Sequence, residues 1–216
     1  MKLTNVLIVY HSLYGHVQAL AKAVQEGAQE VEGVEVTFRR VREVPEYVQH
    51  LEQEKGYGYQ IYQSHARVPE ATLDDLRAAD AVIFGSPTRY GNMTAQMKAL
   101  IDSTAQLWLT GAMEGKVAGV FTSTASTHGG QETTLLTMMV PLIHLGMLIV
   151  GVPYSTPGMI HTDARGGTPY GASTIAGPQG ELKPTADDLM IARVLGRRVA
   201  QTAVALQVGR ATAKAA

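Results

Sequence analysis

The feature that most constrains the fold is an apolar run that passes through a polar turn directly into a helical pattern. Val6–Tyr10 is uninterrupted by polar residues, as expected of a strand covered on both faces. The turn HSLYGH follows at 11–16 with two histidines, two hydroxyls and a glycine, and apolar residues then recur at offsets of three and four from Val17 to Ala28. A buried strand followed at once by an amphipathic helix is typical of parallel sheets. The sequence therefore predicts an α/β fold.

The same alternation continues along the chain. Apolar and alternating patterns predict further strands at 34–38, 81–87, 116–124 and 147–153, the first of them an edge strand. Besides the helix at 17–28, helical spacing predicts three further helices, at 97–108, 131–143 and 185–207. Pro141 must kink its helix or lie near its end, and Thr185 is a plausible N-cap. The order indicates a parallel sheet with helices on both faces.

Two segments are longer than ordinary connections. The first, 45–71, carries tyrosines among charged residues, and the second, 153–182, contains the stretch RGGTPYGASTIAG. Such segments are functional, packed against another subunit or, for the first, disordered. We expect one domain over 1–208, with these two as insertions, and a frayed tail at 209–216.

Composition excludes several classes of function. The 216 residues carry a net charge of -1, which gives no electrostatic footprint for nucleic acid or an anionic membrane. No apolar run reaches the roughly 18 residues that span a bilayer. Cysteine is absent, which excludes disulfides and thiolate chemistry. Because the first strand begins almost at Met1, we expect no signal peptide and a cytoplasmic protein.

Polar loops follow three of the predicted strands. They read HSLYGHV (11–17), SPTRYGNM (86–93) and TSTASTHGG (122–130), and all are rich in hydroxyls, glycine or both. In an open parallel sheet these loops share the carboxyl edge, where ligands bind. Ser12 and the N–H groups that follow it would cradle a phosphate at a helix N-terminus. In the alternative interpretation, Ser12 only caps the helix and Gly15 only relieves a tight turn.

Rival motifs do not fit. No strand is followed by G-x-G-x-x-G, and GAMEGKV (111–117) has one residue too few and Val117 where a P-loop needs Ser or Thr. FGSPT (84–88) lacks the glycines of a nucleophile elbow. The histidines show no metal-ligand spacing, so no metal site is predicted. An enzyme of this kind would need an organic cofactor.

The loops resemble those of the WrbA family of flavodoxin-like proteins. The resemblance rests on YHSLYGHV, GSPTRYGNM, GGQE, the GM after His144 and RGGTPYGASTIAG, in order along nearly the whole chain. It implies a flavodoxin-like three-layer sandwich whose five-stranded parallel sheet has the order 2-1-3-4-5. It also implies non-covalent FMN and a ping-pong NAD(P)H:quinone oxidoreductase. NADH and NADPH both remain open as cosubstrate.

The resemblance also implies roles for individual residues. Those expected to hold the FMN phosphate and ribityl chain are Ser12, Leu13, Tyr14, Gly15, His16 and Val17. Those expected to line the flavin ring are Pro87, Thr88, Arg89, Tyr90, Gly91 and Asn92. The third loop contributes Ser123, Thr124, Ala125, Ser126, Thr127, His128 and Gly129. His144 would reach the flavin edge, and Trp108 and Tyr14 would contact the substrates.

Simpler interpretations stand beside these roles. Pattern alone favours a core position for Trp108, a core or helix-end role for His144, and a packing role for Tyr90. Family resemblance further suggests a homotetramer, with a dimer in equilibrium, and protection against oxidative stress. Two other functions share the same loops: a flavodoxin-type electron carrier and a non-enzymatic binding partner of a regulator. The carrier is disfavoured because such proteins are usually strongly acidic.

Overall fold

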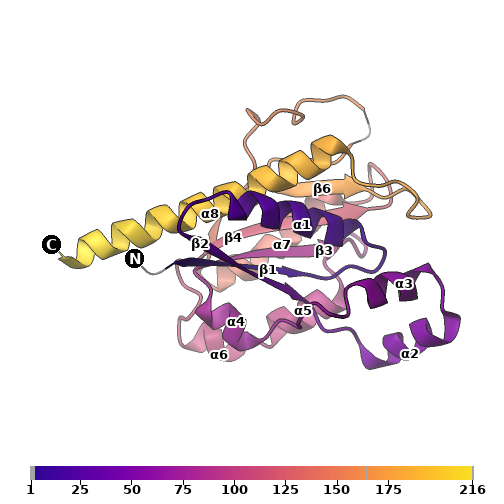
Figure 1. Ribbon diagram of the computed structural model, residues 1–216, viewed down its shortest axis with the longest axis horizontal. Helices are drawn as coiled ribbons and strands as arrows, with labels where there is room; N and C mark the ends of the chain where they lie inside the picture. Colours follow the sequence, from indigo (N-terminus) through magenta and orange to yellow (C-terminus); the bar gives the residue numbers. More distant parts are fainter. Residues whose placement is uncertain (1–2, 164, 216) are drawn as a thin grey trace.

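A central parallel sheet separates two layers of helices in the computed structural model, which describes residues 3–163 and 165–215 (Figure 1). Within this part the sheet has six strands. They are β1 (Thr4–Tyr10), β2 (Val34–Arg40), β3 (Ala81–Pro87), β4 (Val117–Thr124), β5 (Leu148–Ile149) and β6 (Ala172–Ile175). The order β2-β1-β3-β4-β5 confirms the predicted topology.

The strands are in regular parallel register. Val6 pairs with Ala81, Ala81 with Val117, and Val117 with Leu148, so one row of residues crosses four strands. Every residue of β4 is buried, as a strand with helices on both faces requires. β2 is only partly buried along its length, which confirms the predicted edge strand.

Two helices cover one face and four cover the other. The first face carries α1 (His16–Gln29) and α8 (Ala186–Ala215). The second carries α4 (Leu73–Ala78), α5 (Ala95–Asp102), α6 (Ala105–Leu109) and α7 (Gln131–His144). The apolar stripe predicted from Val17 to Ala28 is buried, because it packs between the sheet and α8. Pro141 lies in the last turn of α7, three residues before its end, which confirms the prediction that it lies near the end of its helix.

α1 and α8 approach each other through glycine. A Cβ atom on Gly27 would lie 1.9 Å from the carbonyl oxygen of Arg193, and one on Gly196 would lie 2.0 Å from that of Val24. Neither position can hold a side chain without moving a backbone. The two glycines therefore set the spacing of this helix pair.

The fifth position of the sheet is divided between two strands. The prediction of one strand over 147–153 is wrong in extent, because only Leu148–Ile149 pairs with the start of β4. The rest of β4 pairs with β6, with Phe121 opposite Ala172. β6 belongs to the segment 153–182, so this insertion completes the sheet at the edge where the polar loops lie.

Three other expectations differ from the structure. The single helix expected at 97–108 is two helices, α5 and α6, that meet at a break after Asp102. The segment 45–71 is ordered into α2 (Pro45–Glu54) and α3 (Tyr57–Ser64), which project beside the carboxyl ends of the strands (Figure 1). α8 continues to Ala215 through the segment that was expected to fray from 209, because alanine favours the helix and Arg210 donates to the carbonyl of Gly115 at 2.7 Å.

No helix in the described ranges is long and apolar enough to cross a membrane.

Candidate functional site

A hollow of about 330 Å³ opens at the carboxyl edge of the sheet, where all three polar loops meet. We call it the carboxyl-edge hollow. Its lining includes residues that the sequence singled out: Ser12, Leu13, Tyr14, His16, Val17, Pro87, Thr88, Arg89, Ser123, Thr124 and Ala125. The structure thus brings together residues as distant in the chain as Ser12 and Ser123, which are 111 positions apart. Apolar side chains and hydroxyl side chains both line the hollow, as in sites for amphipathic ligands.

The first loop forms the N-terminal approach to α1. Ser12 is buried, and its Oγ accepts hydrogen bonds from the N–H groups of Gly15 and Gln18, both at 3.2 Å. Gly15 has φ +89°, a conformation that glycine adopts without strain. The first turn of α1 carries no acidic residue, so nothing on the helix competes for its positive end. The loop therefore combines the capping contact with an end that favours an anion.

The second loop ends in a tight turn. Arg89 and Asn92 exchange two backbone hydrogen bonds, at 2.7 and 3.0 Å, across Tyr90 and Gly91. Both central residues have positive φ, +54° for Tyr90 and +78° for Gly91, as in a type I′ turn. The side chain of Tyr90 is fully exposed, so the packing interpretation of this residue is wrong. The turn residues Tyr90, Gly91 and Asn92 lie outside the lining of the carboxyl-edge hollow.

The third loop is shared between two hollows. Ser123, Thr124 and Ala125 line the carboxyl-edge hollow, whereas Thr127 and His128 line a neighbouring one that also touches the second insertion at Arg165. The predicted residues Gly15, Ser126 and Gly129 line neither of these hollows. Only the first part of this loop therefore faces the same space as Ser12.

Residues 176–180 form a wall that sequence reasoning missed. This stretch, AGPQG, lines the carboxyl-edge hollow beside the first loop, where a Cβ atom on Gly180 would lie 3.5 Å from Cε1 of His16. It follows β6 directly, and Nε2 of His16 donates to the carbonyl of Leu182 at 2.9 Å, which ties it to the first loop. The signal was present in the sequence. Glycine and proline directly after a short apolar run are typical of a strand that ends in a binding loop.

Trp108 and His144 lie in a different place. Both are exposed, Trp108 to 58%, so the core interpretation of Trp108 is wrong. They line a second, more open hollow of about 540 Å³, which we call the α5–α7 hollow. Asn92 also lines it, so the turn of the second loop stands between the two hollows. Within one chain, Trp108 and His144 therefore do not share the lining of the carboxyl-edge hollow.

A buried hydrogen-bonded pair, His11 and Glu43, anchors the start of the first loop. Nε2 of His11 donates to Oε2 of Glu43 at 2.8 Å, and Glu43 also accepts from Gln96 and from the N–H of Val44. Burial alone would raise the pKa of the Glu43 carboxyl, but the hydrogen bonds from His11, Gln96 and Val44 outweigh it and lower that pKa. Glu43 therefore stays an acceptor that joins the first loop to α5 and to the start of α2.

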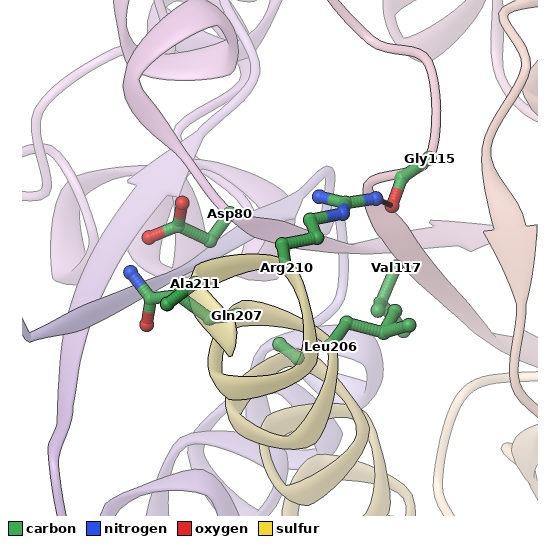
Figure 2. Close-up of a pocket in the computed structure, with 8 residues that line it drawn as sticks. Asp80, Gly115, Val117, Leu206, Gln207, Arg210 and Ala211 are labelled. Atoms are coloured by element: carbon green, nitrogen blue, oxygen red, sulfur yellow. Dashed lines mark hydrogen bonds between the residues drawn. The ribbon is translucent and has the colours of Figure 1, made fainter. Parts of the chain in front are cut away.

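A hollow of similar volume lies at the opposite edge of the sheet, under α8. Its lining includes Asp80, Gln207 and Arg210, and Figure 2 shows Arg210 reaching the carbonyl of Gly115. Asp80 accepts from the N–H of Asn5 at 2.9 Å, so these polar groups already have partners. This is the amino edge, where parallel sheets rarely bind ligands. We therefore place the candidate site at the carboxyl edge. Over the described residues, no cluster of three or more potential metal ligands is found.

Comparison with known proteins decides the family. The sequence profile of the family described as NADPH-dependent FMN reductase matches residues 4–161. The chain belongs to this family. The match covers β1 to β5 and all three polar loops, but it ends before RGGTPYGASTIAG (165–177), on which the resemblance also rested.

Curated relatives of this FMN reductase family member carry one shared name. A protein of Geobacter sulfurreducens named NAD(P)H dehydrogenase (quinone) is 52% identical over 203 residues, covering 94% of this chain and 98% of the relative. One of the same name from Geotalea daltonii is 48% identical and covers 95% and 100%. Among solved structures, a flavodoxin described as a WrbA-like protein from Agrobacterium tumefaciens is 26% identical with a TM-score of 0.62, covering 93% and 97%. These findings confirm the resemblance drawn from the sequence.

Proposed function

We propose that this chain is an FMN-dependent NAD(P)H:quinone oxidoreductase that reduces quinones to hydroquinones by two electrons. The observation that carries the proposal is the carboxyl-edge hollow, where Ser12 and the N-terminus of α1 meet the second and third polar loops. Its relatives named NAD(P)H dehydrogenase (quinone), and its membership of an FMN reductase family, point to the same chemistry. Protection against oxidative stress would be the cellular role.

The residues of the hollow fit the parts of FMN. The phosphate and ribityl chain would be held by Ser12–Val17, because the open positive end of α1 favours an anion. The flat ring would lie against the parts of the second and third loops that line the hollow, 87–89 and 123–125, which include hydroxyl side chains and the methyl group of Ala125. The glycines of 176–180 allow close approach on the remaining side.

The protein's part in the reaction is to bind and orient. When bound, FMN would supply the redox chemistry, namely hydride transfer from NADH or NADPH and two-electron reduction of the quinone in a ping-pong sequence. The stiff turn at 89–92 fixes one boundary of the ring site, so that both substrates meet the ring at a defined position. No side chain is proposed as an acid, base or nucleophile.

Reconstitution tests the proposal. The purified protein is stripped of flavin, titrated with FMN and with FAD, and assayed for NADH and NADPH oxidation with benzoquinone as acceptor. We expect FMN to restore turnover, with parallel lines in double-reciprocal plots at several quinone concentrations. Failure of the FMN-loaded protein to oxidise either nucleotide would refute the proposal.

We propose a homotetramer, in equilibrium with a dimer, as the working state. Exposed apolar side chains gather around the α5–α7 hollow on α6 and α7: Trp108, Leu109, Leu136, Val140 and Ile143. Burial in a subunit interface would remove this surface from water, and would let His144 and Trp108 approach the flavin of another subunit. Sedimentation equilibrium of Trp108→Ala and Val140→Asp, compared with the unchanged chain, would show dissociation if this surface is the interface.

A cytoplasmic location is also proposed, because reduced nicotinamide nucleotides are supplied there. Fractionation of cells with an antibody to the chain would test it.

A further inference from the structure

The helix α3, from the first insertion, lies directly on the first polar loop. The rings of Tyr14 and Tyr57 are parallel within 3°, with their centroids 6.5 Å apart. On the next turn of α3, Ile61 covers Gly15: a Cβ atom placed on that glycine would lie 3.3 Å from Cδ1 of Ile61. α3 therefore forms the outer wall of the loop expected to hold the FMN phosphate.

The insertion is fixed at both of its ends. Before α2, Glu43 is held by His11, the first residue of the first loop. After α3, the buried His65 stacks on Tyr10 at the end of β1, with the Tyr10 hydroxyl 3.4 Å from Nδ1. Both anchors lie within five positions of Tyr14 in the sequence. The position of Tyr57 is therefore tied to that of Tyr14 by contacts on either side of the insertion.

Two flat surfaces and one cation face solvent at this place. Tyr14 is 49% exposed and Tyr57 is 57% exposed, so each ring keeps a face available. Arg89, from the second loop, lines the same hollow as Tyr14 and is exposed. Packing accounts for aromatic side chains that are buried. An exposed parallel pair such as Tyr14 and Tyr57, with the Arg89 guanidinium in the same hollow as Tyr14, is instead suited to bind a planar base that carries phosphate.

We infer that Tyr57, together with Tyr14, binds the adenine ring of NAD(P)H. The inference rests on the proposed function and adds a residue from the insertion to it. A nicotinamide dinucleotide has two planar ends, and only the nicotinamide reacts at the flavin. The adenine needs a second platform outside the hollow, and the pyrophosphate between them carries charge that Arg89 would neutralise. A quinone has no such second end, so Tyr57 should discriminate between the two substrates.

The experiment compares two hydride donors on the FMN-loaded protein. NADH carries the adenylate group, and reduced nicotinamide mononucleotide lacks it. We expect Tyr57→Ala to raise the KM for NADH about tenfold, as expected for the loss of one stacking partner, with little change in kcat. The KM for reduced nicotinamide mononucleotide and the KM for benzoquinone should not change. Tyr57→Phe keeps the ring and should restore the KM for NADH.

Tyr59→Ala is the matched control, since it removes a tyrosine from the same helix that has no ring contact with Tyr14. It should leave all three KM values unchanged. An unchanged KM for NADH in Tyr57→Ala, or an equal rise for both donors, would overturn the inference while leaving the quinone reductase activity intact. Absence of NADH oxidation in the unsubstituted FMN-loaded protein would instead overturn the proposed function.

Discussion

His11 and Glu43 form a buried hydrogen-bonded pair, with 2.8 Å between Nε2 and Oε2. The two residues are 32 positions apart: His11 is the first residue of the first polar loop, and Glu43 shortly precedes the first insertion. Gln96, in the first turn of α5, donates to the same carboxylate. One carboxylate thus fixes the relative positions of three segments that approach the candidate site from different directions.

Removing that carboxylate should destabilise the fold. Glu43→Ala leaves the His11 imidazole buried without its acceptor, and we expect a loss of about 2–4 kcal/mol in the free energy of unfolding. Urea denaturation of the apoprotein measures it. Glu26→Ala is the control, because Glu26 pairs with Arg193 on the surface and should cost less than about 1 kcal/mol. Equal losses in the two variants would contradict this account of the pair.

Ser12 should contribute to flavin binding as well as to helix capping. Ser12→Ala removes the acceptor for the N–H groups of Gly15 and Gln18, so we expect about 1 kcal/mol lower apoprotein stability. FMN affinity should fall by about tenfold, because the loop loses the contact that shapes it and the hydroxyl that is proposed to lie near the phosphate. Quenching of FMN fluorescence gives the affinity. Ser103→Ala, an exposed serine at the end of α5, should change neither quantity.

Two glycines of α8 should respond to alanine in opposite directions. Gly196→Ala places a methyl group 2.0 Å from the Val24 carbonyl oxygen, so α1 and α8 must separate, at a cost of about 3 kcal/mol or more. Gly209→Ala meets no atom within 4 Å and should stabilise the helix by about 0.5–1 kcal/mol. Thermal unfolding of both variants checks the contrast. A mild effect of Gly196→Ala would show that the helix pair is looser than its contacts indicate.

Acid should destabilise the protein partly through His65. Burial, with a smaller contribution from Arg40, lowers the pKa of His65 from 6.5 to about 4. Between these values the unfolded chain binds a proton that the folded chain does not, so stability falls as pH falls from about 6.5 to about 4. The expected loss is about 2–3 kcal/mol. His65→Gln should flatten the pH dependence of urea unfolding in this window, whereas an unchanged slope would assign the dependence to other groups.

The sequence was sufficient where periodicity and burial agree. Val6–Tyr10 reads as a buried strand and the stripe from Val17 to Ala28 as one face of a helix, and packing the helix on the sheet buries both. The pattern therefore predicts the strand, the loop and the helix. The convergence of Ser12, Thr88 and Ser123 on one hollow follows from the shared carboxyl edge of a parallel sheet. These parts depend on local pattern and on topology, and both can be read along the chain.

The remainder depends on contacts between distant segments. Nothing local distinguishes β5 from a longer strand, because the replacement of 150–153 by β6 is decided by pairing with β4. Nor does the spacing in 97–108 reveal the break between α5 and α6. Trp108 follows an apolar helical stripe yet is exposed, since the break changes the direction in which it points. Tertiary context overrides propensity at each of these positions.

The division of the fifth strand position between β5 and β6 connects the edge of the sheet to the candidate site. The chain leaves the sheet after β5, makes an excursion of 22 residues, and returns as β6 to finish the same edge before running straight into 176–180. Sheet edge and ligand wall are thus one continuous piece of backbone. Glycines of the excursion such as Gly166 and Gly171 pack closely on β6 and β4, whereas its exposed residues, among them Tyr154 and Ile160, do not. These exposed positions are therefore where related chains could acquire new selectivity while the scaffold stays as it is.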